Sequence, residues 1–88
     1  MQIEWDPEKA ESNLAKHGVS FWEAATSLLD PMALVQEDAD AEGETRWMLV
    51  GISAQARLLT VIYTLRGEER IRLISARKAT RKEAKYYA

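Results

Sequence analysis

Three strand-like segments follow one another in the second half of the chain, and this run constrains the fold more than any other feature. They cover residues 46–52, 58–65 and 70–75, and they are apolar, rich in β-branched residues or alternating in polarity. The connections at 53–57 and 66–69 are short. Because a parallel crossover needs about a dozen residues or more, connections of this length join antiparallel strands. The sequence therefore predicts an antiparallel sheet.

Two helices are predicted before this sheet. The pair Asp6-Pro7 is typical of a helix start, because the carboxylate accepts free N–H groups and proline lacks a donor that the first turn does not need. Gly18 supplies a left-handed stop, so the first helix covers about 7–17. A second helix opens with the capping-box pattern Ser20-Phe21-Trp22-Glu23 and ends at Asp30-Pro31.

Shorter segments complete the chain. They are strands at 3–6 and 33–36, an acidic loop at 37–44, and a short basic helix at 80–87 that opens with a second capping box. The order is then strand, two helices, four strands and a helix, which indicates the α+β class with an antiparallel sheet. A length of 88 residues favours one domain over 1–88.

Composition excludes several classes of protein. Hydrophobic residues make up 47% and charged residues 30% of the chain, which is typical of globular proteins. Because the chain has no cysteine and one histidine, we expect no disulfide framework, metal site or cofactor. No apolar run approaches about 18 residues, and the start does not resemble a secretory signal. We therefore expect no membrane span and a cytoplasmic location.

Charge is divided unevenly along the chain. Residues 1–44 carry two lysines against eleven acids, a net charge of −9, and residues 45–88 carry ten bases against three acids, a net charge of +7. Such asymmetry is typical of proteins that bind nucleic acid or another polyanion. The alternative is that the two halves interleave in space and pair with each other. Charge alone leaves both interpretations open.

Arginines near the C-terminal end are candidate ligands for phosphate. Arg70 and Arg72 share one face of the last strand, where two planar donor groups can bracket a phosphate, although a solvated face has the same pattern. If the alternation continues, it sends Arg77 to the other side of the strand; the alternative is that Ala76-Arg77-Lys78 lies past the end of the strand. Arg77 and Arg81 also flank the helix start at Thr80, and a helix start attracts anions. The alternative there is a basic first turn without a ligand.

Few side chains are candidates for proton transfer. His17 is the only group expected to titrate near neutral pH without a large perturbation, and Lys16 beside it can stabilise negative charge. The end of a helix also favours a cation, so the residues by themselves favour a capping role for His17. Tyr63 is more typical of an aromatic at the edge of the core than of an acid or base.

Segments spread over the whole chain form one ordered pattern. They are Ile3-Glu4-Trp5-Asp6-Pro7, Lys9, Asn13, Lys16-His17-Gly18-Val19-Ser20-Phe21, Glu23-Ala24-Ala25, Asp30-Pro31, Arg57-Leu58-Leu59, Val61, Tyr63, Arg70-Ile71-Arg72, Ile74-Ser75-Ala76-Arg77-Lys78-Ala79, Arg81, Glu83 and Tyr86. This pattern resembles the BrnT family, the toxin components of type II toxin–antitoxin pairs. The segments K-H-G-V-S-F and I-S-A-R-x-A are its most specific parts.

The resemblance implies a RelE-like α+β fold and a ribonuclease that inhibits translation. It also implies a BrnA-like antitoxin that neutralises the toxin and represses the shared promoter, and a toxin homodimer within that complex. Because this chain shows no helix-turn-helix pattern of its own, we expect contact with promoter DNA only through the antitoxin. Family members often carry a histidine where this chain has Asp40-Ala41-Glu42, and many end in a more arginine-rich helix.

Metal-independent RNA cleavage needs a deprotonated 2′-hydroxyl, a stabilised phosphate and a protonated leaving oxygen. The predicted catalytic residues are His17, Lys16, Arg77 and Tyr63. The predicted RNA-binding residues are Arg70, Arg72, Arg81 and Lys82. The alternative function is a non-catalytic module that binds protein or nucleic acid, such as an inactive relative of the toxin.

Overall fold

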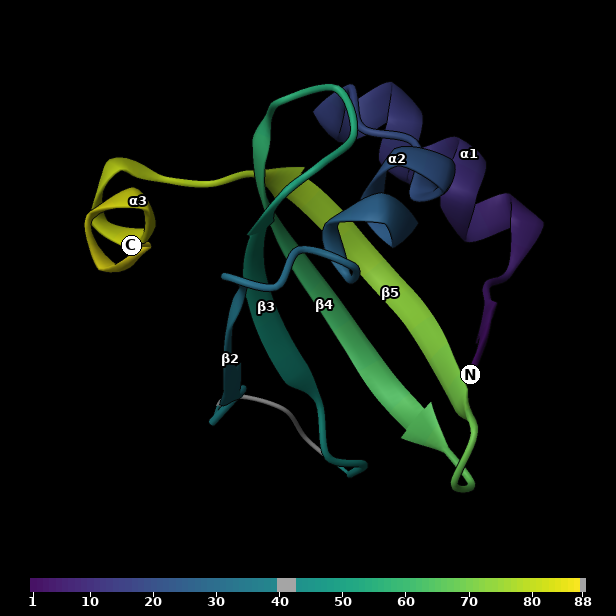
Figure 1. Ribbon diagram of the computed structural model, residues 1–88. Coiled ribbons are helices and arrows are strands. Elements are labelled where there is room, and N and C mark those ends of the chain that lie inside the picture. The colour runs from purple at the N-terminus through teal and green to yellow at the C-terminus, as the bar shows by residue number, and fades with distance from the viewer. Residues whose placement is uncertain (40–42, 88) are drawn as a thin grey trace.

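A computed structural model describes residues 1–39 and 43–87 (Figure 1). The centre of the acidic loop, where the chain has Asp40-Ala41-Glu42, lies outside the described residues. The helices and strands are, in chain order, β1 (Gln2–Glu4), α1 (Pro7–His17), α2 (Phe21–Ser27), β2 (Leu34–Glu37), β3 (Trp47–Ile52), β4 (Leu58–Arg66), β5 (Arg70–Lys78) and α3 (Arg81–Tyr86).

The five strands form one sheet in the order β1-β5-β4-β3-β2. Strands β2 to β5 pair antiparallel, as the short connections predict. Strand β1 is the exception, because it pairs parallel to β5, with Ile3 opposite Ile71. The predicted α+β class, with two helices before the main sheet and one after it, is confirmed. The parallel edge pair could not be read from the sequence because its two strands lie more than 60 residues apart.

The ends of α1 match the prediction. The Asp6 side chain accepts a hydrogen bond from the backbone N–H of Glu8 at 2.9 Å, and Pro7 occupies the first turn. Gly18 has φ 69°, the left-handed conformation that ends the helix, and its N–H donates to the carbonyl of Leu14 at 2.9 Å. Local capping chemistry is therefore sufficient to place this helix.

The start of α2 differs from the predicted capping box in one respect. Ser20 Oγ accepts from the backbone N–H of Glu23 at 3.0 Å, as a cap should. The Glu23 carboxylate does not return to the cap but points to the β3–β4 turn, where it accepts from Ser53 and Arg57. The helix also ends at Ser27 rather than near residue 30. Of the predicted capping box, Ser20 therefore keeps its local role, whereas Glu23 forms tertiary contacts instead.

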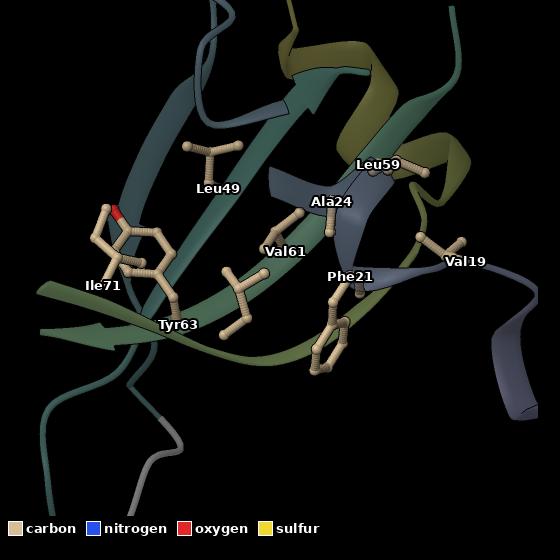
Figure 2. Packing of buried hydrophobic residues seen from close by; sticks show 10 residues of the cluster. Val19, Phe21, Ala24, Leu49, Leu59, Val61, Tyr63 and Ile71 are labelled. Carbon is tan, nitrogen blue, oxygen red and sulfur yellow. The ribbon is translucent and has the colours of Figure 1, made fainter. Parts of the chain in front are cut away.

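Helices α1 and α2 cover one face of the sheet, and the hydrophobic core lies between these helices and the sheet. Figure 2 shows Phe21 and Ala24 from the helical side with Val61 and Tyr63 from β4. The most buried large side chains of this core include Phe21, Leu59 and Leu73, each exposing no more than 1% of its surface. Side chains of the core therefore fill the centre of this face.

The opposite face of the sheet carries polar and basic side chains of β4 and β5. Its register depends on an irregularity in β5: Leu73 pairs with Tyr63, Ser75 pairs with Ile62, and Ile74 has no partner on β4. An extra residue of this kind is a β-bulge, which resets the alternation of the strand. Strand β5 then continues to Lys78, further than the sequence predicts.

The bulge changes the face on which Arg77 lies. Arg72 pairs with Thr64 and Arg77 pairs with Thr60, two residues that share one face of β4 because they are four positions apart. The expectation that Arg77 leaves from the other side of the strand is therefore wrong. We call this surface, carrying Thr60, Thr64, Arg72, Ser75 and Arg77, the arginine face.

Helix α3 sits on the arginine face, away from α1 and α2 (Figure 1). Thr80 and Glu83 form the complete capping box that the sequence predicts. None of the helix residues is fully buried. Polar contacts hold it instead: Glu83 bonds to Thr60 of β4, and the Tyr87 hydroxyl donates to Asp30.

Candidate functional site

The arginine face holds two separate clusters of paired charge. In the first, Arg72 Nη1 lies 2.6 Å from Glu4 Oε2, and Arg70 Nη1 lies 3.5 Å from Glu4 Oε1. The parallel pairing of β1 with β5 sets Glu4 beside Arg72. The Arg72 side chain is 34% exposed, so its guanidinium is reachable from solvent.

The second cluster is centred on Arg77. Its two terminal nitrogens bind both oxygens of Glu83, at 2.7 and 2.9 Å. The same carboxylate accepts from Thr60 Oγ1 and from the Thr80 backbone N–H, each at 2.8 Å. The hydrogen bonds from Arg77, ahead of those from Thr80 and Thr60, outweigh burial and lower the pKa of Glu83 to about 2. Glu83 is therefore a strong anion and a poor proton acceptor near neutral pH.

The bidentate pairing of Arg77 with Glu83 indicates which ligands the Arg77 side chain can bind. A guanidinium offers a planar fork of donors that fits carboxylate and phosphate equally well. Pairing with Glu83 raises the pKa of Arg77, so it stays fully charged. Arg72 and Arg77 lie opposite Thr64 and Thr60, about 13 Å apart along the strand at about 3.3 Å per residue. Two anionic groups of one extended ligand can reach both.

Lys16 and His17 lie at the edge of the same strand. They line a shallow pocket of about 180 Å³ between α1 and β5, together with the bulge residues Ile74 and Ser75. Among the described residues no strand pairs with this part of β5, because β1 pairs only with residues 70–72; the Asn13 side chain of α1 bonds to the backbone of Ala76 there instead. The structure thus brings the two predicted proton-transfer residues beside the bulge that orients Arg77.

The sequence by itself favours a role for His17 in capping the end of α1. In the structure the backbone N–H of Gly18 closes the last turn. The His17 side chain itself makes no hydrogen bond within residues 1–39 and 43–87. Its imidazole is half-buried at the pocket wall. It is therefore available to a ligand.

The structure separates Tyr63 from the other candidates. Its ring packs in the core on the helical side of the sheet, with only 9% of its surface exposed (Figure 2). Burial raises the pKa of its hydroxyl. Arg81 and Lys82 lie exposed on α3, and Lys82 lines a second groove of about 580 Å³ between α3 and strands β2 and β3.

Sequence reasoning missed the acidic and amide partners of this site. Glu4 and Glu83 neutralise the arginines, and Asn13 joins α1 to β5. Glu83 stands in the predicted capping box and, like Glu4 and Asn13, in the BrnT-like pattern, but no role at the site was predicted for any of the three. An asparagine in the middle of a helix is unfavourable locally, and this was the signal that Asn13 has a tertiary role.

Acidic residues of the first half of the chain form ion pairs with arginines of the second half. Three groups of ion pairs join an acid from the first half to an arginine from the second, namely Glu4 with Arg70 and Arg72, Glu23 with Arg57, and Glu44 with Arg66. The pairing alternative raised by the charge distribution is thus realised in part. Lys9, Lys16 and the basic residues of α3 are outside these pairs.

Two features are absent from the described residues. No helix there is long and apolar enough to cross a membrane. Within the same residues, no three histidine, cysteine, aspartate or glutamate side chains gather in a group that could hold a metal ion.

Comparisons with known proteins concern the fold and the family of the chain. A family model described as "Ribonuclease toxin, BrnT, of type II toxin-antitoxin system" matches residues 5–83. The crystal structure of the ribonuclease toxin BrnT from Brucella abortus superposes with a TM-score of 0.71 at 30% identity, covering 92% of this chain and 99% of that chain. No curated protein sequence matches. The chain therefore belongs to the BrnT family of ribonuclease toxins of type II toxin–antitoxin systems.

Proposed function

We propose that this protein is a metal-independent endoribonuclease that inhibits translation by cutting RNA. One observation carries the proposal. The bulge in β5 turns Arg77 to the same face as Arg72, and the same bulge borders the pocket lined by Lys16 and His17. Groups that can hold phosphate and groups that can move protons therefore lie along the same strand, β5, on either side of its bulge.

Each step of RNA cleavage has a candidate group along β5. Arg77 stabilises the additional negative charge on the phosphate as the 2′-oxygen attacks, and Arg72 binds a second anionic group of the same RNA. A phosphate replaces Glu83 on Arg77, because both anions use the same two guanidinium donors. His17 or Lys16 transfers a proton at the 2′-hydroxyl or the leaving oxygen. Arg70, Arg81 and Lys82 extend the binding surface, and Tyr63 has no role in this proposal because it lies in the core.

A second candidate function rests on the paired state of the arginines. In the free protein Arg72 and Arg77 are already bound to Glu4 and Glu83. If these carboxylates remain in place when RNA is present, the site cannot hold a phosphate. The protein is then a binding module that retains the toxin fold without the activity.

The proposal includes the partners that family membership suggests. A BrnA-like antitoxin neutralises the toxin and contacts the promoter DNA, and the toxin is a homodimer within that complex. We place the protein in the cytoplasm, where its RNA substrate is found. The membership in a type II toxin–antitoxin family supports an antitoxin partner of some kind.

RNA cleavage by the purified protein in the presence of EDTA tests the proposal. We expect the wild type to cut RNA, and we expect Arg77→Ala and His17→Ala to lower the rate by about 10²–10³-fold and 10²–10⁴-fold respectively. Arg66→Ala is the control, because Arg66 pairs with Glu44 at the far end of β4 and should retain most activity. Full activity in both site variants would refute the assignment.

Growth of cells gives an independent test. Expression of the protein alone should arrest growth, and expression together with the neighbouring reading frame should relieve the arrest. Harmless expression with tight binding to the neighbouring product would favour the binding module.

A further inference from the structure

The pocket between α1 and β5 contains more than the two residues used above. Its wall also includes Lys9, Ser12 and Asn13 of α1. Positions 9, 13 and 16 follow the spacing of one helix face, and the rise of the helix separates Lys9 from Lys16 by about 10 Å. Two ammonium groups therefore flank the same short stretch of strand edge.

Asn13 fixes the helix face against the strand. Its Nδ2 donates to the carbonyls of Val19 and Ala76, both at 2.9 Å, and its Oδ1 accepts from the backbone N–H of Ala76 at 3.1 Å. With 7% of its surface exposed, Asn13 is buried. The pocket wall is thus held by three hydrogen bonds before any ligand arrives.

The two lysines of this pocket differ from the arginines of the arginine face in their ion pairing. Arg72 and Arg77 each have a carboxylate partner, whereas Lys9 and Lys16 have none within the part of the chain that the structure describes. The hydroxyls of Ser12 and Ser75 are likewise without a hydrogen bond there. The pocket therefore offers positive charge and uncommitted donors but no anion of its own.

We propose that this pocket is a second phosphate-binding site, which holds a phosphate of the RNA next to the one that Arg77 holds. Lys9 supplies the charge, the hydroxyls of Ser12 and Ser75 donate hydrogen bonds, and Lys16 lies between the two phosphates. This inference rests on the proposed function only in taking RNA as the ligand.

Ser75 lies between the Arg77 site and the pocket. It pairs with Ile62 on β4, two positions from Thr60, which pairs with Arg77. Ser75 and Arg77 therefore share a face, and Ser75 also lines the pocket. An RNA strand that leaves Arg77 along β5 meets Ser75 and then Lys9.

Binding of a fully 2′-O-methylated single-stranded RNA, which cannot be cut, tests the inference. For Lys9→Gln we expect the slope of log affinity against log salt to fall by about 0.7, which corresponds to a loss of about fivefold at 0.1 M salt. Lys9→Arg should retain the slope of the wild type. Gln55→Glu, in the β3–β4 turn, makes the same change in net charge outside the pocket and should leave the slope unchanged.

Three results would overturn the inference. They are an unchanged slope in Lys9→Gln, an equal loss in Gln55→Glu, and binding of a polyglutamate peptide through Lys9 as tightly as RNA, which would indicate a site for an acidic protein. Failure of the proposed function has a different signature. A wild-type protein that binds the methylated RNA but leaves the unmodified RNA intact would refute catalysis and leave the second phosphate site standing.

Discussion

Glu23 is the one charged side chain that is buried among the described residues, with 6% of its surface exposed. Burial alone would raise the pKa of this carboxyl, but the hydrogen bond from Arg57 outweighs burial and lowers the pKa. Arg57 also donates to the carbonyl of Gly18 at 3.2 Å. This pair therefore joins the end of α1, the start of α2 and the β3–β4 turn.

Removal of Arg57 should destabilise the fold more than removal of an exposed arginine. Arg57→Ala leaves the buried Glu23 charge unpaired, and we expect the free energy of unfolding to fall by about 2–4 kcal/mol. Arg66→Ala removes an arginine that is 47% exposed and should cost less than about 1 kcal/mol. Urea denaturation measures both. Equal losses would mean that the Glu23–Arg57 pair stabilises the fold no more than a surface pair does.

Among the elements, α3 depends most on charge. It has no fully buried residue, and its attachment to the sheet uses Glu83 bound to Arg77 and Thr60. The hydroxyl of Tyr87 and the backbone N–H of Ile52 both donate to Asp30, whose pKa is lowered mainly by the Ile52 bond. Since hydrophobic burial does not hold α3, protonation of Glu83 should release it without unfolding the core.

The docking of α3 should weaken as the pH falls. The pKa of Glu83 is about 2 in the folded protein against an ordinary value of 4.5. A lowered folded pKa stabilises the docked helix above pH 4.5, and that stabilisation is lost between pH 4.5 and 2. We expect a loss of about 1–3 kcal/mol, since Glu83 is 17% exposed.

Hydrogen-exchange protection of the Ala84 and Tyr87 amides, corrected for intrinsic exchange rates, measures this docking across the pH range. Glu83→Gln is the control, because an amide cannot titrate and the pH dependence should shrink to the part that Asp30 contributes through Tyr87. A docked helix that persists unchanged to pH 2 would contradict the prediction.

The molecule as a whole has a small core and many charge pairs. A chain of 88 residues is expected to have a free energy of unfolding of about 4–13 kcal/mol. The main core cluster lies on the helical side of the sheet, and the other face adds the buried Val50 opposite Thr60. A single large cavity in that core should therefore remove a large part of the total stability.

Leu73→Ala tests this expectation. Leu73 is 1% exposed, so its truncation should lower the free energy of unfolding by about 2–5 kcal/mol. Leu29→Ala is the matched control, because Leu29 is 79% exposed and its truncation should change stability by less than about 0.5 kcal/mol. Thermal and urea unfolding report both variants. A loss below about 1 kcal/mol in Leu73→Ala would mean that the core repacks around the cavity.

Much of the fold could be predicted because its signals are local. The caps at Asp6, Ser20 and Thr80 lie within three residues of the groups they bond. The strand-like runs and short turns of the second half were found from alternation and composition, and the family was identified from motifs along the chain. The site was predicted less completely. Arg72, Arg77, Lys16 and His17 were named, and their roles stay predictions.

The sequence by itself determined the order of helices and strands, where α1 begins and ends, the class of fold and the family, since each depends on neighbours along the chain. Only the tertiary structure decided the parallel pairing of β1, the bulge at Ile74 and the face of Arg77. It also decided that Glu4 pairs with Arg72 and Asn13 with Ala76, across 68 and 63 residues. Such contacts have no local signature, because their energy arises only when distant segments pack against each other.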